Sequence, residues 1–329
     1  MHLSLAGSGS VCPSGLPLPT ANIVSNSVGF DTGTVPDDNV SMKIIDFHTH
    51  IFPPDVIANR ETYRRRDRWF DLLYANPRAR LASASDLVSS MDEAEVDLSV
   101  AFGFGFADPG LCRACNTYVL DTAREHGGRL IPFAVVNPCE HHAASLEARR
   151  CLEMGASGIG ELMPDGQGFE LTDFALLDPL MKLARHFNVP ILIHVNEQVG
   201  HVYPGKGRQG PGQAYLLSMR YPENILVFAH LGGGLAFYEL MPEVRSRLGN
   251  VYYDTSASLY LYDDAVFGYV TSWAPDRVLF GTDYPLVGQG RFLRRVRRAG
   301  LDSDVLDGLL GGNALPLLHR PALHGEEGV

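Results

Sequence analysis

Residues 44–50 read Ile44-Ile45-Asp46-Phe47-His48-Thr49-His50, and this stretch decides the fold. Its apolar start predicts a buried strand. His48 and His50 lie two residues apart, so both imidazoles leave the same face of that strand at its end. Two imidazoles placed in this way form a chelate. The stretch therefore predicts a metal site at the end of the first strand.

Three later apolar runs also close with a residue type that binds metals. Residues 190–194, 225–230 and 278–283 close with His194, His230 and Asp283. A hydrogen-bonded core histidine or a helix-capping aspartate explains any one of them alone, but the repetition of residue type and position favours a shared site. In a barrel of parallel strands the strand C-termini meet on one face, so we expect these side chains to converge there.

Glu161 closes the run 156–161 and is a further candidate ligand. A buried carboxylate is costly unless it is paired or bound to a metal. Lysines are scarce in this chain, and of the predicted strands only the first carries one, Lys43, at the wrong end for a carboxylated lysine that bridges two ions. We therefore expect Glu161 to form any bridge, with a salt bridge at the rim of the barrel as the alternative.

The chain alternates apolar runs with helical patterns, which is typical of βα units and a parallel sheet. Strands are predicted at 43–48, 97–102, 130–136, 156–161, 190–195, 225–230, 251–255 and 277–282. Helices are predicted at 86–95, with Ser85 as N-cap, and at 111–126, 142–154, 173–187, 212–220, 234–248, 263–272 and 290–299. Eight strands suffice to close a barrel, so we expect an α/β protein with a (β/α)8 TIM barrel.

We expect this barrel to span residues 42–318. Residues 1–41 are rich in Ser, Gly, Pro, Asn and Asp and lack the pattern of a signal peptide. They are expected to be a disordered leader, or a mis-assigned start if Met42 is the natural first residue. Residues 319–329 are expected to form a flexible tail.

The connection at 51–84 is much longer than a simple barrel loop, which predicts a lid-like insertion. It mixes several arginines with Trp69 and Phe70. Arg60 is the arginine that we expect to contact an anionic group of the substrate. A solvated helix with a packing aromatic residue is the alternative.

Composition excludes several classes of function. A net charge of −11 disfavours nucleic acid as a partner, because such proteins present a basic face to phosphates. No apolar run approaches the roughly 18 residues needed to cross a bilayer, so no membrane span is expected. Five cysteines, an odd number, argue against a disulfide framework and fit a reducing compartment, which predicts a cytoplasmic protein. Cys112 and Cys115 are expected to pack within a helix.

As a set, these marks resemble the amidohydrolase superfamily, in particular the amidohydrolase-2 family, which also contains the 2-amino-3-carboxymuconate-6-semialdehyde decarboxylase group. The resemblance covers residues 43–315 and rests on the paired histidines of the first strand, the late His194 and His230, and the stretch Gly281-Thr282-Asp283-Tyr284-Pro285. It implies a (β/α)8 barrel with one or two metal ions. Family precedent also implies dimers or higher assemblies, so a homo-oligomer is expected.

The family pattern assigns roles to the candidate ligands. His48, His50 and Asp283 would hold one ion, and His194 and His230 would hold a second when a fourth-strand ligand bridges the two. In one-ion members His194 remains a ligand and His230 contacts substrate or solvent. Zinc suits this ligand set, with manganese or iron as alternatives.

Glu161 departs from the decarboxylase pattern and is more similar to the bridging ligand of binuclear hydrolases. We therefore expect a hydrolase that acts on a small amide, ester, lactone or phosphoester. The metal would lower the pKa of its bound water to about 7, and Asp283 would accept the water proton and deliver it to the leaving group. A non-oxidative decarboxylase of an aromatic or unsaturated carboxylic acid is the alternative. A catalytically silent binding protein is a third.

Two further loops supply candidate substrate contacts. The long Gly-rich loop after His194 contains His201, Tyr203 and Lys206, which either contact a small-molecule substrate or only shape the loop. The residues after the seventh predicted strand, among them Asp254 and Ser256, could also reach the site, with turn formation as the alternative.

Overall fold

The computed structural model describes residues 42–318. The predicted leader at 1–41 and the predicted tail at 319–329 lie outside the described residues. Within 42–318, no helix is long and apolar enough to cross a membrane.

Eight parallel strands form one sheet in chain order, and its first and last strands meet. The strands are β1 (Ile45–His50), β2 (Leu98–Phe102), β3 (Leu130–Ala134), β4 (Gly158–Leu162), β5 (Ile191–Ile193), β6 (Leu226–Phe228), β7 (Val251–Asp254) and β8 (Val278–Leu279). The N–H of Phe47 donates to the carbonyl of Phe280 at 2.7 Å, and the N–H of Asp283 donates to the carbonyl of His48 at 3.0 Å. These bonds close the barrel, so the predicted (β/α)8 fold is confirmed.

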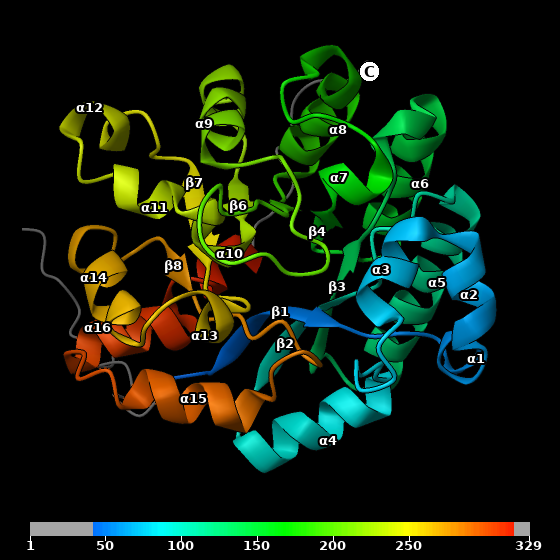
Figure 1. The fold of residues 1–329 in the computed structure, drawn as a ribbon, viewed down its shortest axis with the longest axis horizontal. Helices are drawn as coiled ribbons and strands as arrows, with labels where there is room; N and C mark the ends of the chain where they lie inside the picture. The colour runs from blue at the N-terminus through cyan, green and yellow to red at the C-terminus, as the bar shows by residue number, and fades with distance from the viewer. Residues whose placement is uncertain (1–41, 319–329) are drawn as a thin grey trace, which may run out of the picture. The chain divides into compact units, whose positions relative to one another are not determined.

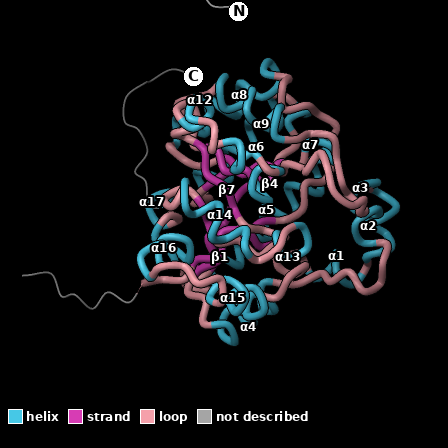
Figure 2. Tube along the Cα trace, turned by 60° about the vertical axis from the view of Figure 1, so that its left-hand side comes forward, coloured by secondary structure: helices cyan, strands magenta, loops and turns pink. Residues whose placement is uncertain are grey.

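Helices surround the strands, as Figures 1 and 2 show. The larger ones are α4 (Ala84–Ala94), α5 (Pro109–Glu125), α6 (His142–Glu153), α8 (Phe174–Phe187), α9 (Pro211–Arg220), α14 (Ala265–Trp273) and α15 (Gln289–Arg297). The shorter ones are α1 (Pro54–Ala58), α2 (Arg60–Arg66), α3 (Arg68–Tyr74), α7 (Pro164–Gln167), α10 (Ala229–Gly233), α11 (Leu235–Tyr238), α12 (Pro242–Arg245), α13 (Ser258–Leu261), α16 (Ser303–Asp307) and α17 (Leu315–Leu318), with η1 (Pro138–Glu140) and η2 (Gly308–Gly312).

The barrel interior is apolar below the strand C-termini. Phe47, Phe133, Leu192, Val227 and Leu279 come from five different strands and form one buried cluster. Such a filled interior is the usual core of this fold and gives the strand ends a rigid base. A second cluster packs the outer face of the sheet against the helices.

Three details differ from the sequence expectations. Ser83, not Ser85, caps α4, and it forms a capping box with Asp86. The helix predicted at 234–248 is broken into α11 and α12, because Pro242 cannot continue a helix and begins a new one. The strands predicted at 190–195 and 225–230 end earlier, at Ile193 and Phe228, so two candidate ligands lie just beyond their strands.

The connection after β1 folds into α1, α2 and α3. Helix α3 packs closely on two loops of the barrel. A Cβ atom at Gly166 would lie 2.8 Å from the Trp69 ring, and one at Gly205 would lie 2.4 Å from Leu73 Cδ2. Only glycine leaves room for these contacts, so α3 is held against the loops that follow β4 and β5.

Candidate metal centre

Six side chains gather at the C-terminal end of the barrel. His48 and His50 lie on β1, Glu161 lies on β4, and His194 directly follows β5. His230 lies in α10, which follows β6, and Asp283 lies in the loop beyond β8. The six form two groups that could each hold a metal ion: His48, His50 and Asp283, and Glu161, His194 and His230. The convergence expected from the sequence is therefore observed.

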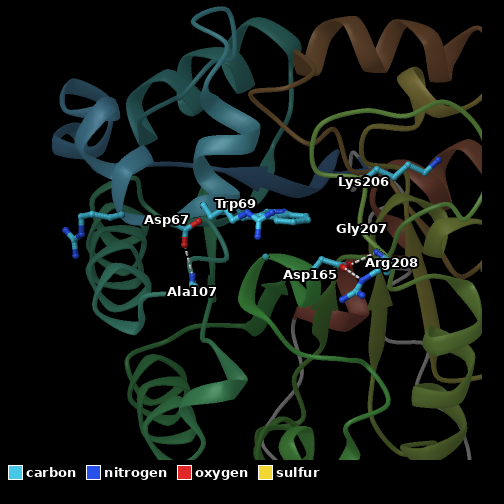
Figure 3. Close-up of a pocket in the computed structure, with 10 residues that line it drawn as sticks. Asp67, Trp69, Ala107, Asp165, Lys206, Gly207 and Arg208 are labelled. Carbon is cyan, nitrogen blue, oxygen red and sulfur yellow. Dashed lines mark hydrogen bonds and ion pairs between the residues drawn. The ribbon is translucent and has the colours of Figure 1, made fainter.

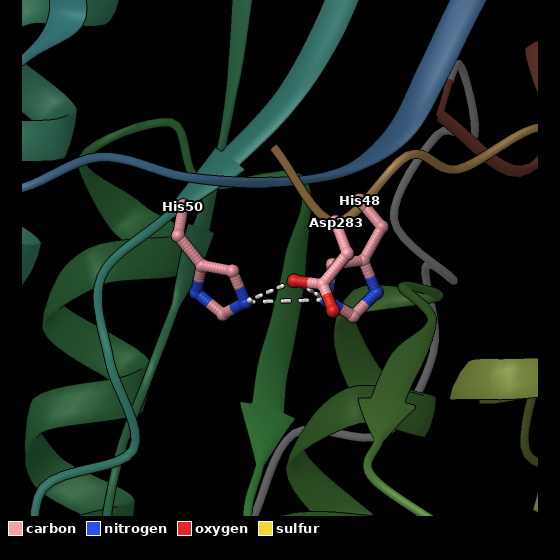
Figure 4. Close-up of side chains that lie close together, drawn as sticks. All are labelled: His48, His50 and Asp283. Carbon is pink, nitrogen blue, oxygen red and sulfur yellow. Dashed lines mark hydrogen bonds and ion pairs between the residues drawn. The ribbon is translucent and has the colours of Figure 1, made fainter. Parts of the chain in front are cut away.

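The first group is compact, as Figure 4 shows. His48 Nε2 lies 3.3 Å from His50 Nε2, and Asp283 Oδ1 lies 3.4 Å from His50 Nε2 and 3.8 Å from His48 Nε2. Glu161 Oε2 lies 3.8 Å from His48 Nε2 and 3.6 Å from His50 Nε2. Ligand atoms around a tetrahedral ion with bonds near 2.1 Å are about 3.4 Å apart, so the spacings among His48, His50 and Asp283 fit.

The second group shares Glu161 with the first. Glu161 Oε1 lies 2.9 Å from His194 Nδ1 and 3.7 Å from His230 Nε2, and the two histidine nitrogens are 3.0 Å apart. One carboxylate therefore directs one oxygen to each group. This arrangement fits the bridging position that the sequence expectation gave to Glu161.

The outer ring nitrogens decide whether a cation fits. His50 Nδ1 lies 2.9 Å from the carbonyl of Gly103, which can only accept, so His50 donates there. His48 Nδ1 donates in the same way to Asp254 Oδ2 at 2.8 Å. When both rings are neutral, both Nε2 atoms carry lone pairs and face each other. A cation between them removes the repulsion, and hydrogen bonds of this kind are typical of metal-binding histidines.

The charges around the histidines also favour a cation. Burial lowers the pKa of His48, but the carboxylates of Asp254, Glu161 and Asp283 raise it more, to about 10. Burial raises the pKa of Glu161, but His48 and His194 lower it more, to about 2. The pKa of Asp283 is also held well below its usual value, because the effect of neighbouring histidines exceeds that of burial. The centre thus combines ionised carboxylates with a strong preference for positive charge.

The backbone that carries His230 is unusual. All residues from His230 to Gly234 have positive φ, from 57° at His230 to 95° at Gly234. The turn places Gly233 against the β5 loop, where a Cβ atom would lie 2.3 Å from the carbonyl oxygen of Asn196. Glycine at position 233 therefore allows this turn to pack against the loop after β5.

A cavity of about 620 Å³ opens above the two groups. Five of the six candidate ligands line it, and His48 lies buried behind them. Its walls are largely apolar and aromatic. They include Trp69, Tyr74, Phe104, Met163 and Tyr260. Such a cavity suits a flat, apolar ligand that carries a polar group at the end next to the histidines.

The substrate-contact candidates occupy different places. His201 and Tyr203 line the cavity, and the Tyr203 hydroxyl donates to Glu197 Oε2 at 2.8 Å. Lys206 lies outside this cavity, where its ammonium donates to the carbonyls of Val199 and His201 at 2.8 and 3.0 Å. Arg60, at the start of α2, is not among the lining residues.

A second cavity, of about 420 Å³, is also lined by Trp69 (Figure 3). Lys206 lines it together with Arg66, Arg68 and Arg208. Trp69 lines both cavities and so forms part of the wall between them.

Sequence reasoning missed two residues of the cavity wall, Arg78 and Arg80. Both belong to the 51–84 insertion, which was expected to supply an arginine. Neither guanidinium forms an ion pair with any residue in the described range 42–318. The only available signal was their position in that insertion, because no periodic pattern relates this loop to the site.

The comparison with known families agrees with this geometry. A family model described as Amidohydrolase matches residues 45–320. The chain belongs to the amidohydrolase family. It is therefore a member of an enzyme family, as expected from the paired histidines and the later strand ends. None of the curated proteins matches the chain.

Several solved structures share the amidohydrolase fold. The chain is similar to 5-carboxyvanillate decarboxylase of Sphingomonas paucimobilis, with a TM-score of 0.70, 16% identity, and 84% of this chain and 99% of that chain covered. It is also similar to the 5-carboxyvanillate decarboxylase of Novosphingobium aromaticivorans, solved with manganese and a nitrobenzoic acid. The TM-score is 0.69, the identity is 18%, and the match covers 84% of this chain and 96% of that chain. For the 2,6-dihydroxybenzoate decarboxylase of Rhizobium, the TM-score is 0.61, the identity is 15%, and the match covers 84% of this chain and 99% of that chain.

The sequence expectation of a hydrolase is wrong. These three relatives are decarboxylases of aromatic acids, which supports the stated alternative. The expectation relied on the bridging character of Glu161. A carboxylate that reaches two groups of ligands shows how a cation could be held, but it does not determine which bond of the substrate breaks. One fold supports several reactions, so ligand pattern alone was an insufficient guide.

Proposed function

We propose that this protein is a metal-dependent, non-oxidative decarboxylase of an aromatic or otherwise unsaturated carboxylic acid. The cavity carries the proposal, because its apolar and aromatic walls end on a floor of candidate metal ligands. An aromatic acid matches both parts, with the ring against the walls and the carboxylate at the floor. The aromatic acids named for the similar decarboxylases belong to the same chemical class.

Arg78 and Arg80 add a preference for anionic substrates. They line the cavity, and within residues 42–318 neither guanidinium forms an ion pair. A guanidinium offers a planar pair of donors that matches a carboxylate or phenolate oxygen. We therefore assign these two arginines, with His201 and Tyr203, to the wall that receives the substrate.

The residues present fit a divalent cation. His48, His50, Asp283 and Glu161 Oε2 would hold it, and His194 is available as a further ligand. When bound, such an ion supplies electrostatic stabilisation of negative charge on the substrate. Zinc, manganese and iron all accept this ligand set, and manganese is bound together with a nitrobenzoic acid in one similar decarboxylase.

The reaction itself needs one proton. The bond between the carboxylate carbon and the substrate carbon breaks, the electron pair stays on the substrate carbon, CO2 leaves, and a proton takes its place. We assign His230 as the proton donor. Ser256 fixes its Nδ1, the residue lines the cavity, and histidines exchange protons near neutral pH. Asp283 suits the ligand role, because its lowered pKa keeps it a carboxylate.

The test is CO2 release from a panel of acids. Protein loaded with Mn²⁺, Zn²⁺ or Fe²⁺ is incubated with hydroxybenzoates, carboxylated methoxyphenols and unsaturated dicarboxylic acids, and metal content is measured on the same sample. We expect one CO2 per molecule of substrate consumed and recovery of the decarboxylated product. Asp283→Ala, which lacks a ligand, controls for metal-independent CO2 release. Loaded enzyme that releases no CO2 from any member of the panel would reject the proposal.

A further inference from the structure

Asp254, the last residue of β7, is a carboxylate that contacts both groups of candidate ligands. It is fully buried and does not line the cavity. Its two oxygens have separate tasks. Oδ2 accepts a hydrogen bond from His48 Nδ1, and Oδ1 accepts hydrogen bonds from the backbone N–H groups of His230 and Ser256.

On the His48 side, the contact sets the ring. Asp254 Oδ2 lies 2.8 Å from His48 Nδ1, and both side chains are fully buried. The hydrogen therefore stays on Nδ1, and Nε2 points its lone pair at His50 and the carboxylates. Behind Asp254 there is little space to move, since a Cβ atom on Gly281 would lie 3.3 Å from the Cβ of Asp254.

On the His230 side, the contact acts through backbone and hydroxyl. Asp254 Oδ1 accepts from the backbone N–H of His230 at 3.1 Å and from that of Ser256 at 3.0 Å, and it also accepts from the Ser256 hydroxyl. Because that hydroxyl hydrogen is used, Ser256 Oγ accepts from His230 Nδ1, 2.9 Å away, and the Ser256 carbonyl oxygen accepts from the same nitrogen at 3.0 Å. Asp254 Oδ1 thus anchors the first residue of the left-handed turn and fixes its ring.

We propose that Asp254 is a positioning residue that sets His48 as a metal ligand and His230 as a proton donor at the same time. The inference rests on the proposed function for the role of His230. All four groups that face Asp254 are donors, so its role needs two accepting oxygens. An asparagine of the same shape presents an NH2 group to one side and loses at least one of these bonds.

The test compares Asp254→Asn with Ser256→Ala. Mn²⁺ affinity is measured by titration with detection of free Mn²⁺ by electron paramagnetic resonance, which requires no substrate. We expect Asp254→Asn to weaken Mn²⁺ binding about 10- to 100-fold, as is usual when the partner of a metal-binding histidine is lost. Ser256→Ala keeps the bond to His48, so its Mn²⁺ affinity should stay within about threefold of the wild type while kcat falls.

Glu239→Gln is the matched control for loss of a buried carboxylate. Glu239 is fully buried and bonds Tyr253 and Arg277, away from the candidate ligands. We expect this variant to lower the thermal midpoint but to keep wild-type Mn²⁺ affinity. Wild-type Mn²⁺ affinity in Asp254→Asn would overturn the proposal. The Mn²⁺ measurement needs no substrate, so it remains valid even if none of the tested acids is decarboxylated. Failure of the decarboxylase proposal can therefore be distinguished from failure of the role proposed for Asp254.

Discussion

At the scale of single residues, His230 combines a strained backbone with a fixed ring. A non-glycine residue in the left-handed region costs roughly 1–2 kcal/mol, and both His230 and Leu231 adopt it. Strain of this size persists only where surrounding contacts determine the conformation, and such places are often functional. The contacts from Asp254 and Ser256 meet that condition.

Replacement of the proposed proton donor gives the first prediction. His230→Asn leaves His48, His50, Asp283 and the nearer oxygen of Glu161 in place, so the variant should still bind Mn²⁺. Without a donor at the cavity, kcat should fall by about 10²- to 10⁴-fold. Single-turnover CO2 release and metal content measured together check this. Loss of metal in parallel with activity would instead identify His230 as a ligand.

Gly233 gives the second prediction, because a side chain there has no space. In Gly233→Ala the new methyl group meets the Asn196 carbonyl at 2.3 Å, and φ is +59°. We expect the free energy of unfolding to fall by about 1–3 kcal/mol, measured by urea titration. Gly249→Ala is the control, since nothing lies within 4 Å of a Cβ atom at that glycine. Equal stability of the two variants would contradict the prediction.

Single residues also show which parts of the site could be predicted from the sequence and which could not. The paired histidines and the later strand ends predicted which six side chains meet, because period two along a strand fixes direction and strand C-termini share a face. Arg78 and Arg80 lie on a loop that follows no period. Their approach to the cavity depends on how α3 packs, and local sequence patterns do not contain that information.

At the scale of elements, α3 and the loop after β4 meet at one contact. The Trp69 ring lies against Gly166, and Trp69 also forms part of the cavity wall. The position of α3 therefore influences the shape of the cavity. The sequence predicted an insertion here from its length alone, and it could not predict that a glycine in a distant loop would receive the indole.

Gly166→Ala tests this contact. A Cβ atom at 2.8 Å from the ring should displace Trp69, and we expect KM to rise several-fold with a smaller change in kcat. The chain has two tryptophans, so Trp273→Phe leaves Trp69 as the only tryptophan, and its emission under selective tryptophan excitation should shift. Gly212→Ala, where a Cβ atom has nothing within 4 Å, is the control. Unchanged emission would show that Trp69 does not move.

Glu147 links α5 to α6 and gives a prediction about pH. Burial raises the pKa of Glu147, but hydrogen bonds from Arg150 and Asn116 lower it more, so the folded pKa lies below its usual value. A lowered carboxyl pKa stabilises the fold above the unfolded pKa of about 4.3, and this stability is lost as pH falls through the folded value. Glu147→Gln should cost about 1–3 kcal/mol at pH 7 and progressively less below pH 4. Urea titrations across this range check it, and a constant difference would contradict it.

Helix starts show a limit of sequence reasoning at this scale. Ser83 and Ser85 both precede the apolar pattern of α4. The structure selects Ser83, because its spacing to Asp86 allows the two reciprocal bonds of a capping box. The serine nearer to the helix pattern was predicted, and it lies inside the helix.

At the scale of the whole molecule, the barrel determines where the ligands meet but not the reaction. Eight βα units could be counted in the sequence, and each apolar run predicted its strand to within a few residues. The reaction depends on what the cavity accepts, and the cavity is formed by loops from several units. The sequence therefore predicted the fold and the convergence of the six side chains, and it predicted the wrong chemistry.

Removal of the metal gives the last prediction. Three ionised carboxylates, Glu161, Asp254 and Asp283, lie close together among the histidines. A cation that binds only the folded state adds about 2.7 kcal/mol at a concentration 100 times its Kd. Chelator-treated protein should therefore unfold at a lower temperature, and the midpoint should rise with added Mn²⁺. A midpoint independent of Mn²⁺ would contradict a metal centre in the folded chain.

The closure of β1 against β8 has a consequence for synthesis in the cell. His48 leaves the ribosome early and Asp283 late, and the hydrogen bond between their backbones forms only when the last βα unit has docked. A nascent chain thus offers a paired-histidine chelate without its carboxylate partner. Full affinity for the ion should arise only once the last βα unit has docked, so occupancy of the centre would depend on the metal supply that the folded barrel meets.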